Sequence, residues 1–228
     1  MAGHDSETGG ADRVRNFTGL RMMRNSPILE ETWRYWTSLR RGTAIPQRST
    51  LDPSAMRLIL GHAMILDRTR HGTTRVRLGG HVMQDLMGME VRGLPIRAFF
   101  DLADRTRVCE QIEQVFEQPA KLELDLISEG SEGIVTARML VLPLTDATGA
   151  VSKALTVMVC DRITRDAPRR FSLTKAQLTP LCEVAEADHP RRRHTDRALP
   201  HELTAGMAES AAPFEGRPSQ VPWLRIVK

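Results

Sequence analysis

The aromatic residues of this chain gather in one short stretch, beside arginines. Residues 31–48 read ETWRYWTSLRRGTAIPQR and hold two of the three tryptophans and the only tyrosine, in a chain that is 4% aromatic. The rings are Trp33, Tyr35 and Trp36, and the arginines are Arg40, Arg41 and Arg48. Rings beside guanidinium groups can bind a ligand or stack on nucleic-acid bases. They can equally cover the apolar face of a sheet.

The histidines do not form a metal-binding motif. His62, His71 and His81 fall near the ends of predicted strands and turns. None of them has a second potential ligand at the sequence spacing of a metal-binding motif. Three further histidines, His189, His194 and His201, lie in a charged C-terminal stretch. There is no HExxH, no paired CxxC and no clustered set of acids. We therefore expect no metal site and no cofactor, although a haem held by a single histidine stays open.

Motifs for catalysis are also missing. The chain contains no GxSxG, no phosphate-binding GxxxxGK[ST] and no GxGxxG after a predicted strand. The run PRRRH at residues 190–194 could touch phosphate, but no helix-turn-helix pattern accompanies it. We predict no catalytic residues, a protein that is not an enzyme, and no direct binding of nucleic acid.

Length and composition limit the class of protein further. The 228 residues allow one domain with a substantial core, or at most two small ones. No apolar run reaches about 18 residues, and the polar N-terminus has no signal-peptide core. The three cysteines are widely spaced, which favours reduced thiols over a set of disulfides. The net charge of +4 indicates a mildly basic surface. We expect a cytoplasmic protein with no membrane contact.

The elements that would position these residues follow a clear order. Residues 1–24 read as a mobile arm. Ser26 and Pro27 then begin a helix that Arg40, Arg41 and Gly42 should end. Two strands joined at His71-Gly72 come next, followed by short helices between residues 81 and 118. Three strands follow in AKLELDLI, GIVTARMLVLPLTD and VSKALTVMVCDRI, with turn-rich links between them.

The region after residue 165 has a weaker pattern. FSLTKAQLTPLCEVAEA, residues 171–187, predicts a short amphipathic helix interrupted at Pro180. We interpret residues 166–228 as a C-terminal extension that is partly disordered. The expected fold is α+β, with one domain over residues 25–165. It has a five-stranded antiparallel sheet, short helices on one face, and the N-terminal helix flanking it.

The last two predicted strands are apolar on both faces, so both faces of the sheet need cover. The helices between residues 81 and 118 can cover one face. The aromatic helix can cover the other, with Leu29, Trp33 and Trp36 on one side of it and Tyr35 in the neighbouring stripe. Covering the sheet is the favoured role over a ligand platform, and contact with another subunit through this helix is compatible with both. The candidate interface residues are Leu29, Trp33, Tyr35 and Trp36.

The order of elements is that of a PAS domain, and three sequence motifs indicate a particular family of such domains. YWTSLRRGTAIPQRSTLDP, RVRLGGHVMQDLMGMEVRG and MLVLPLTDATG occur in this order. Together they resemble a family of bacterial PAS-domain proteins first catalogued as a domain of unknown function, the PAS_5 or DUF1457 group. The resemblance covers roughly residues 25–165. It implies a PAS fold and a regulatory or sensory role, and it supplies no ligand and no catalytic residues.

A PAS fold would place a cleft between the sheet and its helices. The residues expected to bound it are Leu78, Met83, Leu86, Phe99 and Phe100. The cleft can be a filled core or a small-molecule cavity, and we favour the filled core. The cysteine-bearing stretch RTRVCEQIE lacks the Asn-Cys-Arg pattern of a flavin photoreceptor.

Three hypotheses for the function follow. The leading one is a stand-alone PAS regulator with no output domain of its own, which acts through protein contact as a homodimer or with a signalling partner. The alternative is a PAS sensor that binds a small molecule or nucleotide. The third is an NTF2-like α+β enzyme, which would need polar residues facing inward from its strands, where this chain has mostly aliphatic ones.

Overall fold

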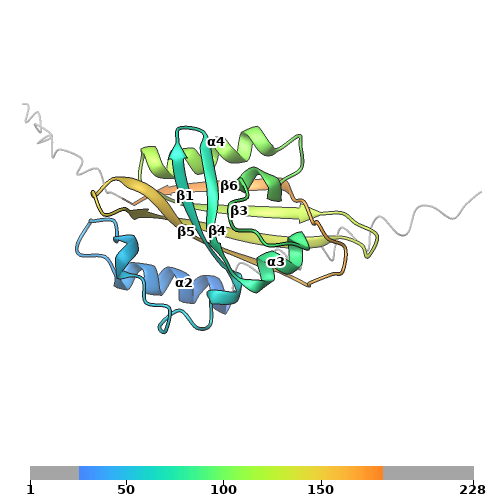
Figure 1. Cartoon of the computed structure of the whole chain (residues 1–228), viewed down its shortest axis with the longest axis horizontal. Coiled ribbons are helices and arrows are strands. Elements are labelled where there is room, and N and C mark those ends of the chain that lie inside the picture. Colours follow the sequence, from blue (N-terminus) through green and yellow to red (C-terminus); the bar gives the residue numbers. More distant parts are fainter. Residues whose placement is uncertain (1–25, 182–228) are drawn as a thin grey trace, which may run out of the picture. The chain divides into compact units, whose positions relative to one another are not determined.

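The computed structural model of the chain describes residues 26–181, which are built on a six-stranded antiparallel sheet (Figure 1). The order across the sheet is β2-β1-β5-β4-β3-β6. The strands are β1 (Ala63–Arg70), β2 (Thr73–Gly79), β3 (Ala120–Ser128), β4 (Val135–Thr145), β5 (Val151–Cys160) and β6 (Ser172–Pro180). The helices are α2 (Pro27–Ser38), α3 (His81–Met87) and α4 (Arg105–Glu117), with short 3₁₀ turns η1 (Arg48–Thr50), η2 (Leu60–His62) and η3 (Ile96–Phe99).

Tight turns join the strands where the sequence indicates them. Gly72, between β1 and β2, has a φ of +70°, a conformation that glycine adopts without the steric cost of a side chain. The turn between β4 and β5 is organised by Asp146. Its carboxylate accepts hydrogen bonds from the backbone N–H groups of Thr148 and Ala150 and from the hydroxyls of Thr148 and Ser152. The antiparallel meander predicted for β3, β4 and β5 is confirmed.

The inner face of the sheet is covered by α3, η3 and α4, as predicted. Their apolar side chains and those of the strands form one continuous core. Val108, Ile112 and Val115 on α4 are each at most 1% exposed, in agreement with the helical spacing of the sequence. Leu122, Leu124 and Leu126 on β3 meet this core from the sheet. Figure 1 shows α4 on the opposite side of the strands from α2.

The outer face of the sheet is covered by α2 and the segment 48–62. Leu29 and Trp36 of α2 pack with Leu142 and Leu155 of the central strands in a second core cluster. The prediction that the aromatic helix covers the second apolar face is therefore confirmed. The helix begins at Pro27 as expected, but it ends at Ser38, before the two arginines that were expected to end it.

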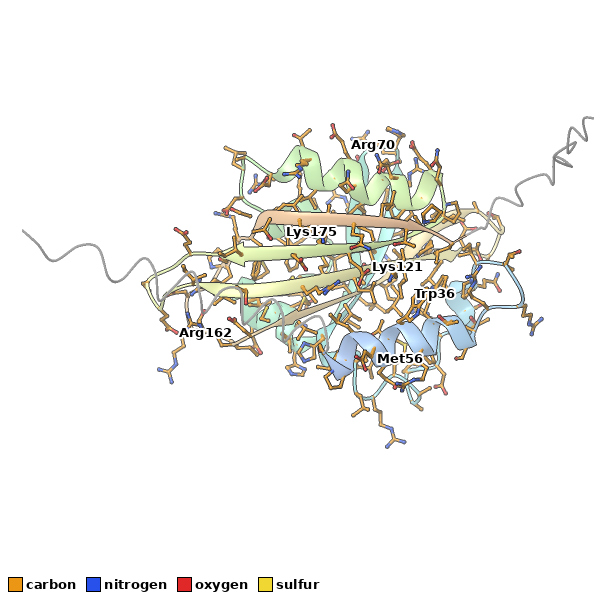
Figure 2. The ribbon with its side chains drawn as sticks, turned by 180° about the vertical axis from the view of Figure 1, so that it is seen from behind. Trp36, Met56, Arg70, Lys121, Arg162 and Lys175 are labelled. Atoms are coloured by element: carbon orange, nitrogen blue, oxygen red, sulfur yellow. The ribbon has the colours of Figure 1, made fainter. Side chains whose placement is uncertain are left out.

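The outer face is not covered by α2 along its whole width. Figure 2 looks onto this face, with Lys121 on β3 and Lys175 on the edge strand β6. Arg138 Nη2 lies 2.9 Å from Glu123 Oε1, and Lys121 Nζ lies 2.9 Å from Glu123 Oε2. The first of these ion pairs joins β4 to β3 and the second lies within β3, so charged side chains occupy this part of the outer face.

The segment predicted to form a short amphipathic helix is instead a strand over residues 172–180. This strand, β6, pairs with β3 and raises the number of strands to six. Leu173 lies opposite Leu126 and joins the inner core, and the preceding Phe171 is fully buried. The free edge of β3 provides backbone partners, and this pairing outweighs a weak helical periodicity. β6 lies within the predicted extension 166–228, whereas the predicted arm 1–24 and the run at 190–194 lie outside the described residues.

Candidate functional site

The cleft predicted between the sheet and the helices is filled by side chains. Met83 and Leu86 of α3, and Phe99 and Phe100 at η3, are each at most 1% exposed. All four belong to the inner core cluster. Their packing leaves them as core residues, which is the interpretation that the sequence favoured.

Leu78 does not belong to this cleft. The side chain is 47% exposed and lines a groove on the outer side of the sheet. The strand pairing explains the difference. Val76 pairs with Leu66, but Leu78 pairs with Ile65, so Arg77 is an extra residue in a β-bulge. Strict alternation along RVRL would turn Val76 and Leu78 to the same face of the sheet, but the bulge reverses the alternation and turns Leu78 to the other face.

The four candidate interface residues on α2 have different degrees of burial. Trp36 is fully buried, and its indole Nε1–H donates to the carbonyl of Pro143 at 3.0 Å. Leu29 is also buried. Trp33 is half-buried and stacks on Trp36, with the two ring centroids 5.6 Å apart. Lys121 Nζ lies 5.1 Å from the centroid of the Trp33 ring. Tyr35 is half-buried too, and its hydroxyl accepts a hydrogen bond from the N–H of Asp52. Trp36 and Leu29 thus hold α2 on the sheet.

The arginines of the aromatic stretch have three separate environments. Arg40 donates to the carbonyls of Thr43, Ala44 and Leu181 and lies over the Trp36 ring, 5.4 Å from its centroid. It therefore ties the end of α2 to the end of β6. Arg41 is exposed, and Arg48 lines the groove that contains Leu78. The three arginines of this stretch therefore do not gather in one place.

A groove with a mostly apolar lining opens on the outer side of the sheet at Leu60 and Leu78. We call it the Leu60–Leu78 groove. Its volume is about 170 Å³. The lining residues are Arg48, Leu51, Pro53, Met56, Leu60, Ala63, Met64, Ile65, Leu78, Gly79 and Gly80. Leu60 and Leu78 are 41% and 47% exposed, so large apolar side chains face solvent at its rim.

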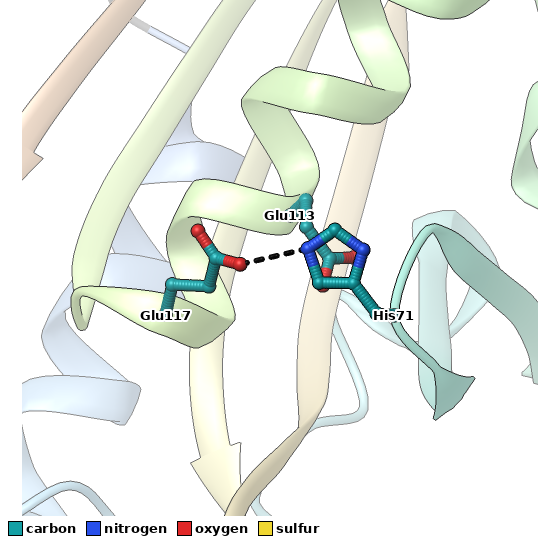
Figure 3. A group of neighbouring side chains, drawn as sticks. All are labelled: His71, Glu113 and Glu117. Atoms are coloured by element: carbon teal, nitrogen blue, oxygen red, sulfur yellow. Dashed lines mark hydrogen bonds and ion pairs between the residues drawn. The ribbon is translucent and has the colours of Figure 1, made fainter.

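A charged cluster, which was not predicted from the sequence, joins the β1–β2 turn to α4 (Figure 3). His71 Nε2 lies 2.9 Å from Glu117 Oε1 and 3.8 Å from Glu113 Oε1. Glu113 also accepts a hydrogen bond from the N–H of Gly72 and forms an ion pair with Arg68. Glu113 and Glu117 are four residues apart on a predicted helix, so they lie on the same helix face. This spacing was the one feature of the sequence that indicated the cluster.

The same cluster has the donor types of a metal site. One ligand atom from each of His71, Glu113 and Glu117 lies within 4.8 Å of the others. However, the guanidinium of Arg68 is paired with Glu113 and lies 3.9 Å from Glu117 Oε1, where it would repel a divalent cation. The ion pairs and the hydrogen bond from Gly72 therefore anchor the hairpin to α4, although the buried Arg68 Nε has no hydrogen-bond partner among the described residues.

A second, larger groove lies next to this cluster. Its volume is about 500 Å³, and its walls come from the β1–β2 turn, η3 and α4. Arg97, Arg105 and Cys109 are among its lining residues. Burial raises the pKa of the Cys109 thiol above its ordinary value of 9.0. This thiol therefore stays protonated and has little nucleophilic character at neutral pH.

The sheet, its two layers and the filled cleft define a PAS domain. The chain belongs to the PAS_5 family of PAS domains, whose pattern matches residues 23–159. No curated protein matches the chain. Within residues 26–181, none of the helices has the length and hydropathy needed to cross a bilayer. PAS domains in general serve sensing and regulation, and the match assigns the fold to PAS domains rather than to NTF2-like proteins.

Proposed function

We propose that this PAS protein is a regulator that acts by binding another protein or a second copy of itself. The observation that carries the proposal is the packing of the cleft. Met83, Leu86, Phe99 and Phe100 occupy the space where a PAS domain could hold a small molecule. A signal then has to reach the protein through its surface.

The surface supports contact with a protein. Leu60 and Leu78 expose apolar side chains at the rim of one groove, and exposed apolar patches of this kind are typical of protein-binding sites. Trp36 is excluded as a direct contact because it is fully buried. Trp33, which is half-buried at the edge of α2, can still contribute to an interface.

The test is affinity purification of the full chain from its native cells, followed by size-exclusion chromatography with light scattering. The proposal predicts either a dimer or a stoichiometric complex with a second protein. A bare monomer at micromolar concentration, with no co-purifying protein, would contradict it.

A second candidate function is a sensor of a small ligand, and the groove beside α4 favours it. Its volume of about 500 Å³ falls within the roughly 300–1,000 Å³ of small-molecule sites. The exposed Arg97 and the half-buried Arg105 could hold an anionic group. Native mass spectrometry should then detect a retained mass that is lost in Arg97→Glu and kept in Arg41→Glu. A spectrum without an adduct would argue against this candidate.

A further inference from the structure

The Leu60–Leu78 groove has the size and lining of a site for side chains rather than for a metabolite. Its volume of about 170 Å³ is below the roughly 300–1,000 Å³ of small-molecule pockets. One or two apolar side chains would fill it. Leu51 and Met56 form part of its buried lining, while Leu60 and Leu78 remain exposed at its rim. An apolar anchor inserted here would remove these leucines from water.

Arg48 adds a charge requirement to this apolar site. It is the one charged residue in the groove lining. Its guanidinium is half-exposed and has no hydrogen-bond or ion-pair partner among residues 26–181. A guanidinium at the rim of an apolar groove is well suited to a carboxylate, which it can hold with two parallel hydrogen bonds.

We propose that the Leu60–Leu78 groove binds a segment of another protein, with an apolar anchor between Leu60 and Leu78 and an aspartate or glutamate on Arg48. This inference rests on the proposed function and names the chemistry of the partner. A groove-to-groove contact between two copies would instead bring two unpaired Arg48 guanidiniums together, and like charges repel across an interface.

The experiment is site-specific photocrosslinking of the full chain in its native cells. The photoreactive residue p-benzoylphenylalanine replaces Leu78 at the groove. In a matched control it replaces Leu102, which is 79% exposed and lies on the other groove. The crosslinked segment is identified by mass spectrometry. The Leu78 experiment is then repeated with Arg48→Glu, and with Arg41→Glu as a control for the same change in net charge.

The proposal predicts a crosslink from position 78 to another protein, in a segment with an acidic residue beside apolar ones. Arg48→Glu should lower its yield by about tenfold or more, which corresponds to about 1.4 kcal/mol, whereas Arg41→Glu should not. A crosslink to a second copy or within the same chain would overturn the proposal. So would the absence of a crosslink at position 78, or a yield that Arg48→Glu leaves unchanged. A partner captured only from position 102 would contradict binding at the Leu60–Leu78 groove, but it would remain consistent with the proposed function.

Discussion

Replacing Trp36 by alanine tests whether α2 is a structural cover of the sheet. Trp36 is fully buried, stacks on Trp33 and donates a hydrogen bond to the Pro143 carbonyl. The variant removes all three interactions and leaves a cavity between α2 and the central strands. Trp33→Ala is the matched control, because Trp33 lies on the same helix but is only half-buried.

The expected loss follows from the burial of the ring. Truncation of a buried large aromatic residue costs about 3–5 kcal/mol. In a domain of this size that corresponds to a fall in Tm of roughly 6–20 °C. Trp33→Ala should cost about 1–2 kcal/mol, because this ring keeps part of its surface in water and loses mainly a stacking contact.

Urea unfolding followed by far-UV circular dichroism is the appropriate assay, since both variants remove a tryptophan and would change the fluorescence signal directly. The free energies of unfolding should fall in the order wild type, Trp33→Ala, Trp36→Ala. A loss below about 1 kcal/mol for Trp36→Ala would refute the reasoning. A larger loss for Trp33→Ala than for Trp36→Ala would refute it as well.

Three further predictions concern the other buried or hydrogen-bonded groups. Hydrogen bonds from Ser152 and Thr148 hold the pKa of Asp146 well below its ordinary value of 3.8, so they contribute stability above that pH that is lost as the carboxylate is protonated. Asp146→Asn should therefore flatten the fall in Tm below about pH 4, and an unchanged acid profile would contradict this. Burial raises the pKa of the Cys160 thiol from 9.0 to about 12, so the folded state should lose stability as the pH rises from 9 towards 12. Tm measured over this range should fall less steeply in Cys160→Ala, and parallel curves would exclude the effect. Arg169 is 2% exposed and donates to Thr164, Asp166 and the carbonyls of Ser128 and Gly133. Arg169→Met should cost about 3 kcal/mol or more in urea unfolding, while the exposed neighbour substitution Arg170→Met should cost less than about 0.5 kcal/mol.

The two-layered architecture could be predicted because it depends on local patterns. Strands β4 and β5 are apolar on both faces, which requires cover on both faces. Ser26 and Pro27 placed the start of α2 correctly, although the Ser26 side chain makes no capping hydrogen bond. A stretch rich in rings was then the natural candidate for the second cover, and Trp36 fulfils that role.

The remaining features depend on contacts that no local pattern contains. A single extra residue, Arg77, turns Leu78 from the inner to the outer face, and alternation alone cannot reveal a bulge. β6 exists because β3 offers it a free edge. The pairing of His71 with Glu117 joins residues 46 positions apart in the chain, so only the folded structure brings them together.

Native mass spectrometry of the full chain, purified gently from its native cells, tests most directly whether this PAS protein acts through its surface. The account predicts a complex whose mass equals that of the chain plus a second protein, or a second copy of the chain. A monomer that carries a small-molecule adduct, or a monomer that carries nothing, would contradict it.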